Sequence, residues 1–530
     1  MRCLAFSVLL AGLVNGATLA KPKLSCAQFG SELVIPNVTV NFATHVPAGT
    51  NLTLSQDYDL ASCGRASQVV DVDMCRLALY VATSSRSGIT LEAWLPMNWT
   101  GRFLSTGNGG VSGCIQYEDL AYGTGFGFAT VGANNGHNGT RGIQAFEGNK
   151  DVVRDFADRS MHTGVLVGKQ LTERFYGNAH SKSYYLGCST GGRQGFKAVQ
   201  TYPEDFDGVV VTAPALKFPS LISWSARFYT ILGNVGDPTF VPPATWRGLI
   251  RTEILSQCDG IDGAVDGIIE DPSLCHFRPE ALLCPSGSPD ATSCLTSIQV
   301  GAVRKVYDDY YGVDGQLIYP GLQPGAEQVA ASVLFSGEPF PYSEDWFKYV
   351  VYDDPNWDAA AYSIQDAKVA IDQNPFNIDT WNGNLSAFES KGGKILHQHG
   401  QEDAIITSGI SPLYYDHVSR TMGKTSAQLD QFYRFFRVSG MGHCSGGDGA
   451  HFIGNQAESF STADPQNNVL LRMVDWVENG NAPETITGTR YFNNDKSQGV
   501  ELVRNHCKYP KRNTCIDPAN HQKAEAWKCV

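Results

Sequence analysis

Runs of hydrophobic residues divide the first part of the chain into strands and helices. Residues 89–95 alternate between apolar and polar positions, which is typical of a half-buried strand. Residues 101–106 predict a second strand, and residues 126–132 form a third apolar run. Residues 152–175 then have apolar side chains at helical spacing, together with pairs of acidic and basic residues. We therefore expect strands and helices in alternation.

The alternation continues through the middle of the chain. Residues 182–186 predict a strand, and residues 193–201 predict a helix that stops before Pro203. Residues 208–214 form a continuous apolar run, which is typical of a strand buried on both faces. Strand, helix and strand in this order predict a mostly parallel sheet with helices on both faces.

From Leu216 to about residue 375 this alternation is lost. Aromatic residues and scattered prolines are frequent in the segment, which also contains a cluster of cysteines. We expect residues 216–375 to form an inserted domain or lid. Residues 21–215 and 376–530 then form one α/β domain around it.

Strand and helix patterns resume after the insertion. Residues 393–400 and 432–438 each predict a strand, and residues 469–479 predict a closing helix that ends at Gly480. Each of the two strands runs into a turn with polar side chains, at the sheet edge where active sites of open α/β sheets form.

Composition narrows the class of protein without naming a substrate. The chain has 530 residues, of which 18% are charged and 42% hydrophobic, as in ordinary globular proteins. Its net charge of -13 argues against nucleic acid or an anionic membrane as a partner. The oligomeric state is not predicted.

The N-terminus has the pattern of a secretory signal. Arg2 precedes a short apolar run at residues 4–14, and small residues follow as candidate cleavage sites. The alternative is a buried N-terminal helix. No later apolar run approaches the ~18 residues that a membrane span needs. We expect residues 1–20 to be a signal peptide and the protein to be secreted and extracellular.

Cysteines and glycosylation sequons agree with export. The chain has 14 cysteines, far more than a reducing compartment favours, and only Cys3 lies in the predicted signal. The odd number that remains leaves one thiol without an intrachain partner. Glycosylation is expected at the N-x-[ST] sequons of Asn37, Asn51, Asn98, Asn138 and Asn384.

The segment Gly187-Cys188-Ser189-Thr190-Gly191 matches G-x-S-x-G, the nucleophile elbow of α/β-hydrolases. In that motif a sharp strand-to-helix turn exposes a serine hydroxyl, and glycines let strand and helix approach closely. A glycine-rich chain also produces so short a pattern by chance, as an ordinary turn. The predicted strand before it and the predicted helix after it favour the elbow.

Two later residues complete a candidate triad. Asp403 and His443 each follow a predicted strand, and the order Ser189, Asp403, His443 is that of α/β-hydrolases. The serine hydroxyl needs the histidine as a base, and the histidine needs a carboxylate to hold its tautomer. Singly, each residue is typical of an ordinary turn. Together they predict catalysis by an activated serine.

Three neighbouring residues leave alternatives open. Glu402 competes with Asp403 for the acid role. His397 and His399 are expected to be strand residues, although one that faces the cleft can contact substrate.

A glycine-rich turn at residues 107–110 follows the strand at residues 101–106. Lipase-like hydrolases place an oxyanion-hole amide at this point. We expect the amide of Thr190 and one from Gly109 or Gly110 to stabilise the oxyanion. The alternative is a flexible turn.

Cysteines flank the candidate nucleophile and base. Cys188 precedes Ser189, and Cys444 follows His443. If the serine and the histidine are hydrogen-bonded, their neighbours can reach the ~5–6 Å Cα spacing of a disulfide. We expect a Cys188–Cys444 bridge that holds the two catalytic loops together.

The motif Gly187-Cys188-Ser189-Thr190-Gly191-Gly192, with Asp403 and His443-Cys444, resembles the fungal tannase/feruloyl esterase family. That family is marked by Cys-Ser, Asp and His-Cys segments whose two cysteines are bridged. The resemblance covers the whole mature chain, including residues 105–110 and 474–480. It implies an α/β-hydrolase fold with an inserted lid domain.

The resemblance also implies an activity. We expect a serine carboxylesterase for feruloyl, p-coumaroyl and caffeoyl esters, both of plant cell-wall polysaccharides and of other phenolics, with no cofactor for catalysis. One alternative is a tannase that cleaves galloyl esters with the same triad; another is a catalytically silent binding protein. Aromatic residues of the lid that could stack on a phenolic ring are Trp224, Phe228, Tyr229, Tyr342 and Trp346, although core packing is the expected role of each one individually.

Residues 259–271 contain closely spaced carboxylates and glycines, which suit a hard cation although the spacing is not that of an EF-hand. The alternative is an acidic surface loop. Similar proteins of the family hold a structural calcium in the lid at the matching segment. The resemblance thus implies calcium ligands in this chain: carboxylates of Asp259, Asp262 and Asp266, and carbonyls of Ala264 and Ile268.

The remaining cysteines are expected in disulfides. Cys258 and Cys275 flank the acidic segment and are expected to close it. We expect Cys507 to pair with Cys529, which leaves Cys515 without a partner. Other cysteines expected in disulfides are Cys26, Cys75, Cys63, Cys114, Cys284 and Cys294.

Overall fold

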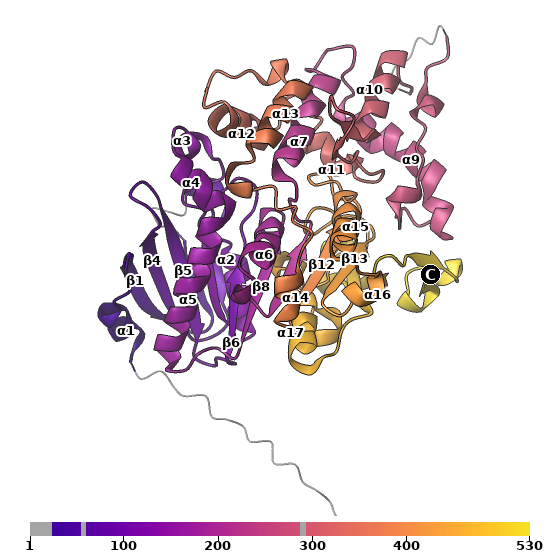
Figure 1. Ribbon diagram of the computed structural model, residues 1–530. Coiled ribbons are helices and arrows are strands. Elements are labelled where there is room, and N and C mark those ends of the chain that lie inside the picture. The colour runs from indigo at the N-terminus through magenta and orange to yellow at the C-terminus, as the bar shows by residue number, and fades with distance from the viewer. Residues whose placement is uncertain (1–23, 55–59, 287–292) are drawn as a thin grey trace, which may run out of the picture.

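The computed structural model describes residues 24–54, 60–286 and 293–530, so the predicted signal at residues 1–20 lies outside the described residues. Within them, nine strands form one sheet in the order β1-β4-β5-β7-β6-β8-β9-β12-β13 (Figure 1). The strands are β1 (Val38–Val46), β4 (Met74–Ala82), β5 (Gly88–Pro96), β6 (Arg102–Thr106), β7 (Ala129–Ala133), β8 (Lys182–Cys188), β9 (Gly208–Thr212), β12 (Lys394–Gly400) and β13 (Tyr433–Val438).

The sheet is parallel from β7 to β13 and antiparallel from β1 to β7. The predicted strands at residues 89–95, 182–186 and 208–214 are confirmed as β5, β8 and β9. Those at residues 393–400 and 432–438 are confirmed as β12 and β13. The mostly parallel sheet that the alternation predicts is therefore present.

Helices cover both faces of the sheet, because adjacent strand residues point to opposite sides. On β6, Phe103 belongs to one hydrophobic cluster and Leu104 to another. On β8, Tyr185 belongs to the cluster of Phe103, and Tyr184 belongs to the cluster of Leu104. Helices α5 (Ser160–Tyr176) and α6 (Thr190–Thr201) pack on the Phe103 side, and α2 (Tyr117–Gly125) and α17 (Val469–Asn479) on the Leu104 side.

One predicted helix is divided in the structure. The pattern at residues 152–175 predicts a continuous helix, but α4 (Lys150–Arg154) and α5 are joined by a π-helical turn, Asp155–Arg159. At this turn the buried Asp155 carboxylate accepts hydrogen bonds from Thr83, Ser87 and Arg159. Hydrophobic spacing does not record such polar contacts, so the interruption was not predicted.

The segment between β9 and β12 contains most of the remaining helices. Figure 1 shows several of them gathered at one end of the sheet, above α6 and α15 (Ile410–Met422). They are α7 (Phe218–Leu232), α8 (Pro243–Thr245), α9 (Arg251–Cys258), α10 (Ser297–Tyr307), α11 (Glu327–Val333), α12 (Pro341–Trp346) and α13 (Ile364–Gln373), with the short strands β10 (Tyr310–Tyr311) and β11 (Leu317–Tyr319).

This insertion shares its core with the rest of the molecule. Trp346 of α12 packs edge-on against Phe146 at a ring-centroid distance of 6.1 Å and lies 6.0 Å from Phe156. All three belong to one hydrophobic cluster, which runs from the insertion onto the sheet. The insertion is thus fixed to the sheet by burial of aromatic surface.

The shorter elements complete the described chain. They are α1 (Cys26–Glu32), α3 (Ile143–Phe146), α14 (Ser386–Ser390), α16 (Ser426–Leu429), β2 (Thr50–Thr53), β3 (Ser67–Val70), β14 (Thr485–Tyr491), β15 (Val500–Cys507), β16 (Asn513–Cys515) and β17 (Trp527–Cys529). None of the described helices is both long enough and apolar enough to cross a bilayer.

Six disulfides lie among the described residues. They join Cys26 to Cys75, Cys63 to Cys114, Cys188 to Cys444, Cys258 to Cys275, Cys284 to Cys294, and Cys507 to Cys529. Cys515 is buried and unpaired. The asparagines of the five sequons are all exposed: Asn37, Asn51, Asn98, Asn138 and Asn384.

Candidate active site

Ser189 lies at the sharp turn between β8 and α6. Its backbone has φ 63° and ψ -124°, a strained conformation for a residue other than glycine. Strand and helix approach each other closely at this turn. A Cβ on Gly187 would lie 2.7 Å from the carbonyl group of Gly191, so the position requires glycine. The local geometry is therefore that of the nucleophile elbow.

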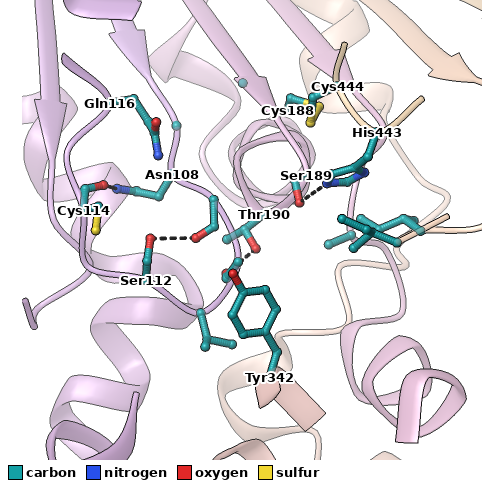
Figure 2. Close-up of a pocket in the computed structure, with 18 of the residues that line it drawn as sticks. Asn108, Ser112, Cys114, Gln116, Cys188, Ser189, Thr190, Tyr342, His443 and Cys444 are labelled. Carbon is teal, nitrogen blue, oxygen red and sulfur yellow. Dashed lines mark hydrogen bonds between the residues drawn. A yellow bond between two sulfur atoms is a disulfide. The ribbon is translucent and has the colours of Figure 1, made fainter. Parts of the chain in front are cut away.

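The structure brings Ser189, His443 and Asp403 together from the ends of three strands. Nε2 of His443 lies 2.9 Å from Oγ of Ser189, and Nδ1 lies 2.7 Å from Oδ2 of Asp403. Figure 2 shows the contact between Ser189 and His443 at the cavity wall. The histidine is thus placed to take the serine proton while its other nitrogen donates to the carboxylate.

Asp403 is held as an anion. It is fully buried, and its Oδ1 accepts the backbone N–H groups of Ile405 and Ile406 at 2.9 Å each. Burial alone would raise its pKa, but the charge of His443 and the hydrogen bonds from His399 and His443 hold the pKa well below its usual range. An ionised carboxylate is what the histidine needs to keep its tautomer and orientation.

Glu402 points away from the histidine. Its Oε1 lies 3.5 Å from the Arg251 guanidinium of the insertion, and its Oε2 accepts the N–H of Asp448 at 3.0 Å. Burial, then the charge of Asp448, raises the pKa of Glu402 to about 8. Of the two adjacent carboxylates, Asp403 is therefore the one that contacts His443.

His397 and His399 are buried residues of β12, as expected, and neither lines the cavity around Ser189. Nε2 of His399 lies 3.2 Å from Oδ2 of Asp403 and 3.0 Å from the carbonyl of Ile406. Both partners are acceptors, so this nitrogen carries the proton. His399 is thus a second histidine that donates to the triad carboxylate, a role that the sequence did not reveal.

A chain of buried hydrogen bonds continues behind His399. Its Nδ1 lies 2.6 Å from Oγ of Ser411, which lies 2.8 Å from Nε2 of His397. Nδ1 of His397 lies 2.9 Å from the Tyr433 hydroxyl. Burial lowers the pKa of His397, which keeps it neutral. The chain fixes the tautomer of each histidine and aims the proton of His399 at Asp403.

We expect the substitution His399→Leu, which removes the donor, to lower kcat about tenfold with little change in KM. One hydrogen bond to a charged group contributes about 1.5–3 kcal/mol. Its loss raises the pKa of Asp403 and makes that carboxylate a stronger acceptor for His443, so the acid limb of the kcat/KM profile should move to higher pH. His45→Leu, at an exposed position of β1, is the control. An acid limb that stays in place in His399→Leu would contradict this role.

The loop after β6 supplies the candidate oxyanion hole. Oγ1 of Thr190 donates to the carbonyl of Gly110 at 2.6 Å, and the N–H of Gly191 donates to the carbonyl of Asn108 at 2.7 Å. The backbone N–H groups of Thr190, Gly109 and Gly110 have no hydrogen-bond acceptor among the described residues. All three residues line the Ser189 cavity, so their amides are candidates to stabilise a developing oxyanion, with Gly109 and Gly110 both still open.

The Cys188–Cys444 disulfide joins the two catalytic loops. Its Cα atoms lie 5.8 Å apart, although the residues are 256 positions apart in sequence. Figure 2 shows the bridge directly beside Ser189 and His443. The bridge therefore constrains the distance between nucleophile and base.

A cavity of ≈ 370 Å³ lies at Ser189, and its lining includes two chemically different sets of side chains. We call one the apolar half, formed by Phe218, Leu221, Ile222, Phe340, Tyr342 and Ile406. We call the other the polar half, formed by Arg65, Gln116, Glu118, Asp119, Gln456 and Glu458. Most of the apolar half comes from the insertion, whereas the polar half comes from α2 and two loops of the α/β domain.

Of the predicted ring-stacking residues, Tyr342 lines the cavity and four others do not. Trp224 and Phe228 pack edge-on against each other at 4.7 Å. Trp346 is buried in the shared core, and the hydroxyl of Tyr229 donates to an asparagine at the exposed end of α7. These four serve packing or local structure, the role that was expected of each of them individually.

The apolar side chains that do line the cavity include Phe218, Leu221 and Ile222, which the prediction missed. They lie at positions i, i+3 and i+4 of α7, on one helix face. This stripe was visible in the sequence, but spacing alone does not tell a cavity wall from a core face.

The predicted calcium ligands lie in the loop after α9. Asp259 accepts the N–H of Gly267, Asp262 accepts that of Ala264, and Asp266 pairs with Arg504 at 3.1 Å. Within the described part of the chain, no three or more His, Cys, Asp or Glu side chains are grouped as a metal site. This finding concerns side chains alone, so it does not bear on backbone carbonyl ligands such as those predicted for Ala264 and Ile268.

The acidic loop is short of positive charge. Burial, with the charges of Glu270 and Asp266, raises the pKa of Asp262 to about 7, and burial also raises that of Asp259. The guanidinium of Arg504 pairs with both Asp266 and Glu270. An all-oxygen donor set of this kind suits a hard cation.

Comparison with known proteins places the chain in a family. The sequence model described as "Tannase and feruloyl esterase" matches residues 75–530. A "Probable feruloyl esterase B-2" of Neosartorya fischeri is 55% identical over 517 residues, which cover 97% of each chain.

Two crystal structures of Aspergillus oryzae proteins are also similar. An esterase is 56% identical, with a TM-score of 0.93, over 95% of this chain and 99% of that one. Feruloyl esterase B is 50% identical, with a TM-score of 0.92, over the same shares. The predicted α/β-hydrolase fold is thereby confirmed, and the chain belongs to the tannase and feruloyl esterase family.

Proposed function

We propose that this protein is a serine carboxylesterase that hydrolyses esters of hydroxycinnamic acids, such as feruloyl, p-coumaroyl and caffeoyl esters. The observation that carries the proposal is the hydrogen-bonded Ser189–His443–Asp403 set at the wall of a half-apolar cavity. Relatives that cover nearly the whole chain bear the name feruloyl esterase, which supports the same class of substrate.

The geometry supports a two-step acyl transfer. Oγ of Ser189 attacks the ester carbonyl while its proton passes to Nε2 of His443. The oxyanion accepts hydrogen bonds from the N–H of Thr190 and from that of Gly109 or Gly110. As the carbonyl reforms, His443 returns the proton to the departing alcohol. Water, activated by the same histidine, then releases the carboxylic acid and restores the serine.

The apolar half suits a hydroxycinnamoyl group better than a galloyl group. A cinnamoyl unit is a planar ring with a propenoyl arm, whereas a galloyl ring carries three hydroxyl groups. Burying hydroxyls without partners costs about 1–3 kcal/mol each. The side chains of Phe218, Leu221, Ile222 and Phe340 offer no hydrogen bonds, and within this half only Tyr342 carries a hydroxyl. A ring with one or two hydroxyl groups therefore fits this half better than a ring with three, which disfavours the tannase alternative.

An ester panel tests the proposal. We expect kcat/KM for methyl ferulate and methyl caffeate to exceed that for methyl gallate by at least about tenfold, as expected for the loss of one hydroxyl's hydrogen bonds. A preference for methyl gallate would favour a tannase. Failure of a serine-directed phosphonate to label Ser189 would instead favour a catalytically silent binding protein.

Export and domain organisation form part of the proposal. The predicted signal at residues 1–20, the disulfides and the exposed sequon asparagines support a secreted, glycosylated protein. The apolar half of the cavity comes largely from residues 216–375, which supports a lid function for the insertion. Its proposed partners are plant phenolic esters, neither nucleic acid nor membrane.

We also propose a structural calcium in the loop after α9. The carboxylates of Asp259, Asp262 and Asp266 and the carbonyls of Ala264 and Ile268 would hold it. The ion would supply the positive charge that this buried acidic loop lacks. Catalysis itself needs no cofactor in this proposal, because the triad and the oxyanion-hole amides supply each proton and each hydrogen bond.

Removing calcium with a chelator should lower Tm by about 2 °C, if the ion is present at about 100 times its Kd. The substitution Asp262→Asn should lower calcium content, measured by elemental analysis, and remove the response of Tm to the chelator. Asp464→Asn, at an exposed site far from the loop in sequence, is the control. The site would be refuted if the purified protein contained no calcium and its Tm did not change when calcium was added.

A further inference from the structure

Gln194 is a buried residue of α6, and its side-chain amide contacts two asparagines that lie just beyond neighbouring strands. Oε1 of Gln194 accepts the backbone N–H of Asn108 at 3.1 Å. Nε2 donates to Oδ1 of the same Asn108 at 3.1 Å and to Oδ1 of Asn135 at 2.9 Å. Asn108 follows β6 and Asn135 follows β7, so one amide ties the loops after two strands to the catalytic helix.

The orientation of each of these amides is fixed by a backbone partner. The N–H of Asn108 can only donate, so the atom of Gln194 that it meets is the oxygen. Nδ2 of Asn108 donates to the carbonyl of Cys114 at 2.9 Å (Figure 2), and Nδ2 of Asn135 donates to the carbonyl of Ser112 at 2.7 Å. Both asparagine oxygens are therefore left to accept from Nε2 of Gln194.

Asn108 is held on several sides, and it directly precedes the candidate oxyanion amides. Its N–H and Oδ1 bond to Gln194, and its carbonyl accepts the N–H of Gly191 at 2.7 Å. That carbonyl and the N–H of Gly109 belong to one planar peptide group. Fixing Asn108 therefore fixes the direction of the Gly109 N–H and the point from which the chain continues to Gly110.

Both sides of the candidate oxyanion hole are thus positioned from one helix. Thr190 begins α6 and contributes its own N–H, whereas Gln194 lies four residues, about 6 Å, farther along the same helix. Oxyanion donors have to lie within about 2.7–3.1 Å of the charged oxygen. A loop that is bonded to the helix of the nucleophile keeps such a distance from the nucleophile.

We propose that Gln194 is a positioning residue for the oxyanion hole, which holds residues 108–110 where the N–H of Gly109 or Gly110 meets the developing oxyanion. The inference rests on the proposed esterase function. Gln194 touches no reacting atom in this role, because it acts through Asn108. Without its amide, buried polar groups of Asn108 and Asn135 lose their partners, and the loop has to shift to satisfy them.

The substitution Gln194→Met tests this role, because it removes the amide and keeps a side chain of similar length. Rates are measured per active site, counted by stoichiometric labelling with a serine-directed phosphonate. We expect kcat on methyl ferulate to fall about tenfold to a hundredfold, since a displacement of ~1 Å costs about a hundredfold. KM should change little, because the apolar half of the cavity is untouched.

Two inhibitors separate positioning of the oxyanion hole from general damage to the site. In a trifluoromethyl ketone analogue of methyl ferulate, Oγ of Ser189 adds to the carbonyl carbon, the serine proton passes to His443, and the carbonyl oxygen becomes an oxyanion. Ferulamide instead binds with a planar, neutral carbonyl. In Gln194→Met the Ki of the ketone should rise by about the factor by which kcat falls, whereas the Ki of ferulamide should stay nearly constant.

Gln200, near the other end of α6, provides the matched control. Its Nε2 donates to the carbonyl of Thr380 at 3.1 Å and to the Tyr414 hydroxyl at 2.8 Å. Gln200→Met should therefore leave kcat and both Ki values as in the wild type. A second variant, Gln194→Asn, keeps the amide but shortens its reach, and it should shift kcat and the ketone Ki in the same direction as Gln194→Met. It decides the question if Gln194→Met does not fold.

Two results would overturn the positioning role while the wild-type enzyme hydrolyses methyl ferulate. One is a ketone Ki that stays at the wild-type value in the folded Gln194 variants. The other is an equal rise of Ki for ketone and ferulamide, which is what general damage produces. A wild-type enzyme that hydrolyses no ester of the panel would refute the proposed function itself.

Discussion

The substitution Ser189→Ala should abolish ester hydrolysis and leave the fold intact. Ser189 supplies the attacking oxygen. The hydrogen bond of its hydroxyl to Nε2 of His443 is not part of the hydrophobic packing, so its loss should not disturb the fold. Members of a triad act as a unit, so His443→Ala should cost about as much, on the order of 10⁴–10⁶ in kcat. Activity on methyl ferulate and circular dichroism spectra measure the two parts of the expectation.

A serine outside the site provides the control. Ser497 is exposed, and Ser497→Ala should keep wild-type kcat. Retention of more than about a hundredth of kcat in Ser189→Ala would exceed what oxyanion hole and binding alone sustain. Such a result would place the nucleophile elsewhere.

The strands and the triad were predictable because both leave local signals. A buried strand such as β9 is a continuous apolar run, and the elbow around Ser189 needs small residues at fixed positions. Asp403 and His443 follow strands that the pattern also predicts. The order of the three along the chain then restricts the fold, since parallel strands place their carboxyl ends at the same edge.

The choice between Glu402 and Asp403 depended on contacts that no local pattern records. The two adjacent carboxylates point in different directions at the turn after β12. The backbone N–H groups of Ile405 and Ile406 donate hydrogen bonds to Asp403. Arg251, about 150 residues away in sequence, draws Glu402 toward the insertion. A partner so distant is set by the tertiary fold alone.

The walls of the cavity were predictable only in part. Residues of α7 such as Phe218 form a recognisable stripe, yet Trp224 on the same helix is a larger aromatic and is fully buried. Which face of α7 meets the cavity depends on how the insertion packs on the sheet. Polar cavity residues such as Arg65 and Gln456 gave no signal, because half-buried polar residues are common on any surface.

Loss of the Cys188–Cys444 disulfide should damage catalysis more than folding. The bridge closes a loop of 256 residues, for which chain entropy predicts a stabilisation of about 5 kcal/mol. The fold retains five other bridges among the described residues and a hydrophobic core that spans sheet and insertion. Most of the secondary structure should therefore survive in a Cys188→Ala, Cys444→Ala double variant.

The active site is less tolerant, because the bridge lies beside both members of the catalytic pair. The Ser189 to His443 distance of 2.9 Å depends on two loops that no other covalent bond joins among the described residues. A displacement of ~1 Å costs about a hundredfold in rate, so kcat of the double variant should fall by about that factor. The control is the double variant Cys284→Ala, Cys294→Ala, which removes a separate bridge in the insertion and should keep kcat.

Peptide mapping without reductant should recover Cys188 and Cys444 linked in the wild-type enzyme. Free thiols at both positions in active enzyme, or full kcat in the double variant, would show that the bridge does not position the pair.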